Sequence, residues 1–226
     1  MIQHHPDDNL LAEYSAGALA WALSLGVATH LHFCSECRNR VTQMNKIGAV
    51  LLDSCQAQKI PENALDQVLR RIQLEGDSVA MAPAAVPTKR IFKDTMLNDL
   101  PKLVARLIPD NQPLRWQFVS PALKMARLRT GQNQYEVAFH RINSGGKVPE
   151  HDHKGLEVTV VLKGSFSDEN GIYTPGDFMV RQKGEVHRPT AAQNQDCLCF
   201  SITESPVYLT SLLGKLINPF LRVKPA

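Results

Sequence analysis

The chain has 226 residues, of which 43% are hydrophobic, and its formal net charge is +3. This length accommodates one large domain or two small ones, and the apolar fraction is that of an ordinary globular protein. The apolar stretches fall short of the roughly 18 residues that a membrane span needs. The N-terminus lacks the basic start and apolar core of a signal peptide, so we expect a cytoplasmic protein without a membrane anchor.

Charge and histidine content both divide the sequence into two parts. Residues 1–80 carry 6 basic and 9 acidic side chains, whereas residues 81–226 carry 19 and 13. Seven of the eight histidines fall into two groups, four within residues 4–32 and three within 151–187. Five cysteines in a reducing compartment favour metal or redox chemistry over a disulfide framework. The sequence therefore predicts two modules, each with its own group of histidines.

The first part of the chain, residues 7–73, has helical periodicity. Asp7 or Asp8 can cap a helix that starts near Asn9, and Gly26 is expected to break the pattern before a second helix that carries Cys34 and Cys37. The helical pattern continues over 41–52. A further helix opens at Pro61, with an apolar side formed by Leu65, Val68, Leu69 and Ile72.

Small residues and two prolines over 76–90 predict a linker between the two modules. We therefore expect a small helical domain over 1–80, a linker over 81–95 and a β-barrel domain over 96–226. A short helix is expected over 97–107, before the first strand. The last helix is expected over 211–221, with an apolar stripe packed on the barrel; a dimer contact is the weaker alternative.

From Trp116 onward, short β-type runs alternate with turns, many of them containing glycine. This texture is typical of an all-β sandwich or barrel. The predicted strands cover 115–120, 124–130, 135–142, 157–163, 165–167, 172–173, 177–180, 187–190 and 197–203. The fold class predicted for the whole chain is α+β, a helical bundle followed by a β-barrel.

A first candidate metal site lies in the helical part. His30, Cys34 and Cys37 are spaced so that they share one face of a helix. Two thiolates and an imidazole suit zinc, which prefers tetrahedral nitrogen and sulfur ligands. His5 is a fitting fourth ligand, and His4 is a rival that spacing does not separate from it. The alternative is a surface CxxC pair beside incidental histidines.

A second candidate metal site lies in the β-rich part. His151 and His153 point to the same side of an extended strand, Glu157 follows an even number of residues later, and His187 comes from a partner strand. Three imidazoles and a carboxylate suit a divalent ion such as zinc, iron, manganese or nickel. The alternative is a metal-free pocket that these polar side chains merely line.

The pattern around these residues resembles the two cupin motifs. From Gly145 to Gly164, every defined position of G-x5-H-x-H-x3-E-x6-G is matched. The second motif, from Gly176 through His187, departs from the cupin pattern at Gln182 and Ala191 without losing a ligand.

The two modules in this order resemble the ChrR family of zinc-binding anti-sigma factors, over nearly the whole chain. The matching stretches are 4–8, 10–17, 28–37, 151–157 and 196–199. The resemblance implies that residues 1–80 clamp an extracytoplasmic-function sigma factor, and that a second zinc in the cupin domain belongs to a sensor of singlet oxygen or related oxidants. It carries the ligand roles onto His5, His30, Cys34 and Cys37, and onto His151, His153, Glu157 and His187.

The remaining histidines and cysteines are given structural roles. Cys197 and Cys199 alternate onto one face of a strand and are expected in the core, with a sensory thiol as the alternative. His140 is expected in the core or at the surface, and His32 is expected to be exposed.

Two other functions compete with the regulator. One is a metal-dependent cupin enzyme, such as a dioxygenase or an isomerase, in which an open metal position binds substrate or oxygen. The other is direct DNA binding, which is disfavoured because the Cys/His module is net acidic and has no basic stripe.

Overall fold

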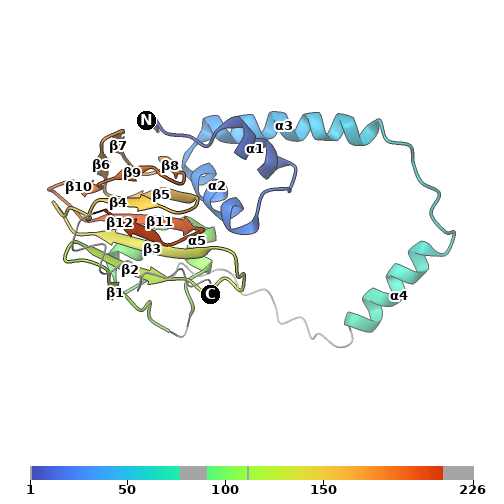
Figure 1. The fold of residues 1–226 in the computed structure, drawn as a ribbon. Coiled ribbons are helices and arrows are strands. Elements are labelled where there is room, and N and C mark those ends of the chain that lie inside the picture. Colours follow the sequence, from blue (N-terminus) through green and yellow to red (C-terminus); the bar gives the residue numbers. More distant parts are fainter. Residues whose placement is uncertain (1, 77–90, 111, 211–226) are drawn as a thin grey trace. The chain divides into compact units, whose positions relative to one another are not determined.

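The computed structural model describes residues 2–76, 91–110 and 112–210 (Figure 1). The predicted linker over 76–90 therefore lies almost wholly outside the described residues, and the predicted helix over 211–221 lies wholly outside them. By packing, the described residues form two compact units. One contains those of 1–47 together with those of 99–226, and the other contains those of 48–98. The domain boundary over 81–95 stays a prediction.

Four helices precede residue 77: α1 (Asp8–Ser15), α2 (Trp21–Phe33), α3 (Ser35–Asp53) and α4 (Ala64–Gly76). The predicted cap of the first is confirmed, because the Asp7 carboxylate accepts a hydrogen bond from the Leu10 amide at 2.8 Å. The helix expected after Pro61 is α4. Among the helices that the structure describes, none combines the length and apolar character that a bilayer crossing requires.

The predicted break at Gly26 is wrong, because α2 continues through it. A Cβ at this position would lie 2.9 Å from Cδ1 of Ile202 and 3.0 Å from Cγ1 of Val158. The glycine therefore serves a close approach of the helix to the barrel rather than a turn. The helix ends instead at Cys34, whose backbone is extended (φ −98°, ψ 108°). Cys34 thus lies in the break between two helices, and Cys37 lies on the second.

Two short helical segments lead into the β-rich part, where one helix was expected over 97–107. They are the 3-10 turn η1 (Thr95–Leu97) and α5 (Lys102–Arg106). The strands that follow are β1 (Gln117–Phe118), β2 (Leu123–Arg127), β3 (Glu136–Ile142), β4 (His151–His153), β5 (Glu157–Lys163), β6 (Phe166–Asp168), β7 (Gly171–Tyr173), β8 (Phe178–Arg181), β9 (Val186–His187), β10 (Thr190–Ala191), β11 (Cys197–Thr203) and β12 (Val207–Leu209).

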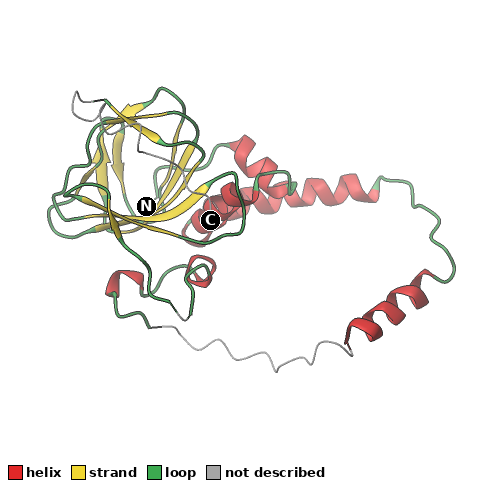
Figure 2. Cartoon of the chain, turned by 60° about the horizontal axis from the view of Figure 1, so that its bottom comes forward, coloured by secondary structure: helices red, strands yellow, loops and turns green. Residues whose placement is uncertain are grey.

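These strands form a cupin-like antiparallel fold. The large sheet has the order β1-β2-β3-β11-β5-β8, and two smaller sheets have the orders β10-β6-β7 and β12-β4-β9. Figure 2 shows the strands curved around a common interior. The expected run over 187–190 is divided between β9 and β10, which belong to different sheets, and β12 was not expected. The predicted order of a helical region followed by a β-barrel is confirmed.

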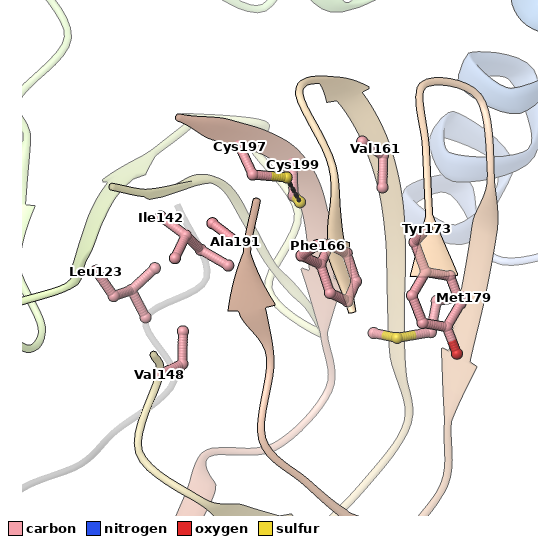
Figure 3. Close-up of a cluster of buried hydrophobic side chains, with 10 residues drawn as sticks. All are labelled: Leu123, Ile142, Val148, Val161, Phe166, Tyr173, Met179, Ala191, Cys197 and Cys199. Atoms are coloured by element: carbon pink, nitrogen blue, oxygen red, sulfur yellow. Dashed lines mark hydrogen bonds between the residues drawn. The ribbon is translucent and has the colours of Figure 1, made fainter. Parts of the chain in front are cut away.

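The interior of the barrel holds a cluster of buried, mostly apolar side chains that includes Leu123, Val161 and Phe166. Figure 3 shows that the cluster also takes in Cys197 and Cys199, whose Sγ atoms lie 3.7 Å apart. The core role predicted for these two cysteines is therefore what the structure shows.

Helix α2 belongs to the core of the same unit as the barrel. It packs against β5, β11 and α5, and more than half of its residues are buried. An exposed helix needs only one apolar stripe, whereas a helix that is apolar on most sides must be covered on most sides. The helical residues up to 47 therefore pack with the barrel as one compact unit.

Gly26→Leu tests the close packing of α2 against the barrel. Overpacking against Ile202 and Val158 is expected to lower the free energy of unfolding by about 1–3 kcal/mol in chemical denaturation. The matched control is Gly48→Leu on α3, where a Cβ meets nothing within 4 Å. That change is expected to be neutral or stabilising by about 0.5–1 kcal/mol, since glycine is a poor helix former. Equal stability of the two variants would contradict the close packing of α2.

Two histidine clusters as candidate metal centres

The first cluster, called the His/Cys cluster, contains His5, His30, Cys34 and Cys37. One side-chain nitrogen or sulfur atom from each lies within 4.8 Å of the others. Nδ1 of His5 is 3.4 Å from Sγ of Cys34 and 3.3 Å from Sγ of Cys37. His4 lies outside this group, with its ring 4.4 Å from that of Tyr173 between centroids. The structure thus places His5, and not its rival, among the other three.

Helix α2, the break after it and the start of α3 each position one residue of the His/Cys cluster. His30 lies in the last turn of α2, Cys34 occupies the break between the helices, and Cys37 lies in the first turn of α3. The Cys37 amide points at Sγ of Cys34, at 3.4 Å, as a free N–H of a helix start can. The exposed His32, on the other side of α2, takes no part.

The orientation of His30 is fixed from the barrel. Its Nδ1 lies 2.6 Å from the carbonyl oxygen of Gly176, so Nδ1 carries the proton and donates it to that oxygen. The opposite nitrogen, Nε2, is buried and has no hydrogen-bond partner among the described residues. A buried polar atom without a partner is costly, and it indicates a ligand that this atom would bind.

The turn at Gly176 and Asp177, between β7 and β8, also holds the N-terminal segment. The Asp177 carboxylate accepts hydrogen bonds from the amides of Gln3 (2.8 Å) and His4 (3.0 Å). Burial alone would raise the pKa of Asp177, but the amides of His4, Thr174 and Gln3 outweigh burial and hold the pKa below its ordinary value. The position of His5 therefore depends on a carboxylate of the barrel.

The His/Cys cluster has the chemistry of a zinc site. Burial, together with the neighbouring Cys34, raises the pKa of the Cys37 thiol to about 12, and burial lowers the pKa of His30. Without a cation, the pocket thus favours neutral groups. A bound divalent ion reverses this for the thiols by stabilising the thiolate form. Two thiols and two imidazoles fit the closed tetrahedral set of structural zinc sites.

The second cluster, called the three-histidine cluster, contains His151 and His153 from β4 and His187 from β9. Their ligand atoms also lie within 4.8 Å of one another, and all three rings are buried. The pleat of β4 points His151 and His153 to one side, and β9 pairs with β4 so that His187 is opposite His151. Nε2 of His151 and Nε2 of His187 are 3.0 Å apart.

Each of these rings has an oxygen partner at Nδ1. His151 Nδ1 lies 2.8 Å from the Pro149 carbonyl oxygen, His153 Nδ1 lies 3.1 Å from Glu157, and His187 Nδ1 lies 3.0 Å from Asp168. Proton donation from Nδ1 leaves Nε2 as the lone-pair atom, which is how metal-binding histidines are normally oriented. Nε2 of His153 is buried without a hydrogen-bond partner among the described residues.

The three-histidine cluster therefore presents uncharged imidazole rings to a metal ion. Burial and the neighbouring His187 lower the pKa of His151 to about 4, so its ring is uncharged at neutral pH. Neutral imidazole is the form that binds metal ions. Three such rings fit a borderline divalent ion.

Glu157 lies beside the three-histidine cluster and not within its set of converging atoms. One carboxylate oxygen contacts Nδ1 of His153, and the other accepts hydrogen bonds from the hydroxyls of Thr159 (2.9 Å) and Ser201 (3.1 Å). Burial would raise its pKa, but the contact with His153 outweighs burial, and Glu157 is ionised. The residue predicted as a ligand is thus charged and adjacent to the cluster.

The sequence motifs missed Asp168, whose carboxylate contacts His187 at Nδ1, the nitrogen that faces away from the cluster. Its fully buried carboxylate contacts Nδ1 of His187 at 3.0 Å and the Arg181 guanidinium at 2.6 Å. Arg181 in turn donates a hydrogen bond to the Tyr173 hydroxyl at 3.0 Å. The cupin pattern gave no signal for Asp168, because it lies on β6, outside both motifs, and only strand pairing brings it to His187.

Comparisons with known proteins agree with this architecture. Residues 104–205 match the model of the "ChrR Cupin-like domain" family. The anti-sigma-E factor ChrR of Cereibacter sphaeroides is 34% identical over 222 residues, which cover 98% of this chain and 99% of that protein. ChrR in the crystal structure of Rhodobacter sphaeroides SigE with the anti-sigma factor ChrR superposes with a TM-score of 0.71 and 30% identity, covering 90% of this chain and 99% of that one.

The fold and the two clusters define a two-part protein, a helical region with a His/Cys cluster followed by a cupin domain with a three-histidine cluster. The chain belongs to the family of the anti-sigma factor ChrR. The resemblance seen in the sequence is thereby confirmed over nearly its full length.

Asp177→Ala tests how the N-terminal segment is held. Because hydrogen bonds to charged groups contribute about 1.5–3 kcal/mol, the amides of Gln3 and His4 are expected to exchange hydrogen at least about tenfold faster. The control is Glu185→Ala, whose carboxylate accepts from Gln182 instead. The pKa of Asp177 is lowered by folding. The stability that its carboxylate contributes is therefore fully present above the unfolded-state pKa of about 3.9 and is lost as the pH falls through the folded-state pKa. Unchanged exchange in Asp177→Ala would contradict this role.

Proposed function

We propose that this protein is an anti-sigma factor that binds an extracytoplasmic-function sigma factor and blocks its access to core RNA polymerase and promoter DNA. The observation that carries the proposal is similarity to ChrR along essentially the whole of both chains, including the helical region. The protein acts by binding and not by catalysis, in the cytoplasm, where its partner works. A cupin dioxygenase or isomerase is disfavoured, because the relatives matched over their full length are anti-sigma factors.

The exposed apolar side of α4 supports a protein partner. Leu65, Val68, Leu69 and Ile72 follow the spacing of one helical face, and each is roughly half exposed or more. None of the described α4 side chains, 64–74, is buried. A helix of 13 residues is marginal in water without packing. An unpaired apolar face of this kind indicates a surface that another protein covers.

The end of α3 has the same character. Ile47, Val50, Leu51 and Leu52 are all more than 60% exposed. We propose that Val50, Leu51 and Leu52 and the apolar face of α4, all in the unit of residues 48–98, form the sigma-binding surface. This surface would be part of an anti-sigma domain over 1–80 that the linker over 81–95 joins to the cupin domain over 96–226.

Ile72→Asp on α4 is expected to weaken the complex with the partner sigma factor by about 30-fold or more. A charge at a buried apolar contact costs on the order of 2 kcal/mol or more. Ile172→Asp on β7 is the matched control, since Ile172 is 63% exposed and Ile72 is 60% exposed. The measurements are co-purification of full-length chains and the Kd. Equal binding of both variants, or no stoichiometric complex with the wild type, would overturn the proposal.

We further propose that each histidine cluster holds one zinc ion. The ligands of the first are His5, His30, Cys34 and Cys37, a set that saturates a tetrahedral ion and serves a structural role. The ligands of the second are His151, His153 and His187. Glu157 is proposed as the fourth on the cupin motif, and its carboxylate would have to turn from Nδ1 of His153 to reach the ion. The unpartnered Nε2 atoms of His30 and His153 support one ion at each place.

Metal analysis of the purified chain tests this proposal. We expect about two zinc ions per wild-type chain, and about one in either Cys37→Ser or His153→Ala. Asp168→Asn removes the charge behind His187 and is expected to weaken one site by about 10–100-fold. Glu169→Gln, one residue further along and exposed, is the control with unchanged affinity. Two zinc ions retained in His153→Ala, or another metal in the wild type, would contradict the assignment.

The trigger that we propose is oxidation by singlet oxygen or a related oxidant. Thiolates and imidazoles are oxidisable, and loss of one ligand weakens a metal site. Because the barrel holds both His30 and the segment before His5, damage in the cupin domain has a physical route to the His/Cys cluster. Release of the sigma factor from His151→Ala/His153→Ala under singlet oxygen is the test; unchanged release would remove the cupin cluster from the mechanism.

A further inference from the structure

The barrel contains a cavity of about 400 Å³, and the three-histidine cluster forms part of its wall. This volume lies within the range of about 300–1,000 Å³ that small-molecule sites occupy. His151 and His187 line the cavity together with apolar side chains from other strands, among them Leu123, Met125 and Phe166. The cavity therefore joins an apolar wall to a candidate metal centre.

The alternation of side chains along each strand decides which residues line the cavity and which face away from it. On β2, Met125 lines the cavity while its neighbour Lys124 lies on the other face of the strand. Across the sheet, Met125 is paired with His140, and His140 with Cys199. Met125 and Cys199 therefore flank His140 on the neighbouring strands, and Glu157 and Thr159 form part of the polar wall of the cavity.

The negative charges of the cavity wall are already compensated. Glu136 is paired with Arg127 at 2.6 Å, and Glu157 is held by His153 and two hydroxyls. His140 differs from them. Its ring is half-buried, lines the cavity and has no hydrogen-bond partner among the described residues. His140 therefore offers an unused hydrogen-bonding nitrogen to whatever enters.

We propose that this cavity binds a small monocarboxylate with an apolar body, its carboxylate directed at the metal ion of the three-histidine cluster and at His140. The proposal goes beyond sigma binding and rests only on the metal assignment made above. A zinc ion bound by three neutral imidazoles and one carboxylate keeps a net positive charge and can expand from four to five ligands, so it can take an anionic oxygen and repels an ammonium group. The apolar wall takes the hydrocarbon part.

The residues at the entrance agree with an apolar ligand body. Phe118 and Val119 line the cavity, and they are 76% and 46% exposed. Large apolar side chains in water at the edge of a cavity provide a surface over which a hydrocarbon group can pass. Val207 and Leu209 of β12, half-buried, line the same cavity.

The test is calorimetric titration of the zinc-loaded full-length chain with acetate, butanoate and octanoate. Affinity is expected to rise by about fourfold for each methylene that the cavity buries. Octan-1-ol and octylammonium are the charge controls, and both are expected to bind at least about tenfold more weakly than octanoate. In cobalt-substituted protein, octanoate is expected to change the visible absorption bands, which report ligands of the metal.

Variants locate the binding. Met125→Trp fills the cavity and is expected to weaken octanoate binding by at least about tenfold, with Met125→Phe intermediate. Lys124→Trp, on the other face of the same strand, is expected to leave the affinity within about twofold. His140→Leu keeps a similar volume and should lose affinity for octanoate more than for octan-1-ol.

Two results would overturn the inference: octanoate binding that Met125→Trp and Lys124→Trp affect equally, or zinc-loaded protein that does not prefer octanoate to octan-1-ol. Thermal unfolding and zinc content, measured on every variant first, separate these outcomes from misfolding and from failure of the metal assignment. Sigma binding is measured independently, so its failure is distinguishable from failure of the ligand site.

Discussion

The turn at Gly176 and Asp177 is the constraint on which the rest of this structure depends. Gly176 has a positive φ of 95°, and a Cβ there would lie 2.7 Å from Ile2 and from Phe33. The backbone of the turn can therefore approach the helical region as closely as it does only because residue 176 is a glycine. From that position its carbonyl oxygen orients His30, and the Asp177 carboxylate holds the chain just before His5. The barrel thus sets the geometry of the His/Cys cluster.

The two clusters share one physical design. In each, an oxygen acceptor occupies Nδ1 of a buried histidine and leaves an Nε2 atom without a partner. Burial lowers the pKa of His30 in one cluster and of His151 in the other, and neutral imidazole is the form that binds metal ions. The clusters are also linked through the barrel: Asp168 and Arg181 lie between His187 and Tyr173, and the ring of Tyr173 contacts that of His4.

Much of the architecture could be predicted from the pattern of residues. Apolar spacing located α4, and the strand runs located most of the sheets, because one face of each element is chemically distinct from the other. Spacing also selected the three histidines of the cupin cluster. It failed at Gly26, where a residue that usually interrupts helices serves a tight contact with Ile202. It also gave no signal for Asp168, whose contact with His187 joins strands far apart in the sequence.

The sequence by itself determined the order of helical region and barrel and the residues able to bind metal, since these follow from residue type and local spacing. It indicated the class of protein through its resemblance to a known family. Only the tertiary structure places His5, and not His4, beside Cys34 and Cys37, because Asp177 fixes the amides of residues 3 and 4. It placed Glu157 against Nδ1 of His153. It also showed that the helices up to residue 47 pack as one unit with the barrel. Each of these is set by long-range packing, which no local pattern encodes.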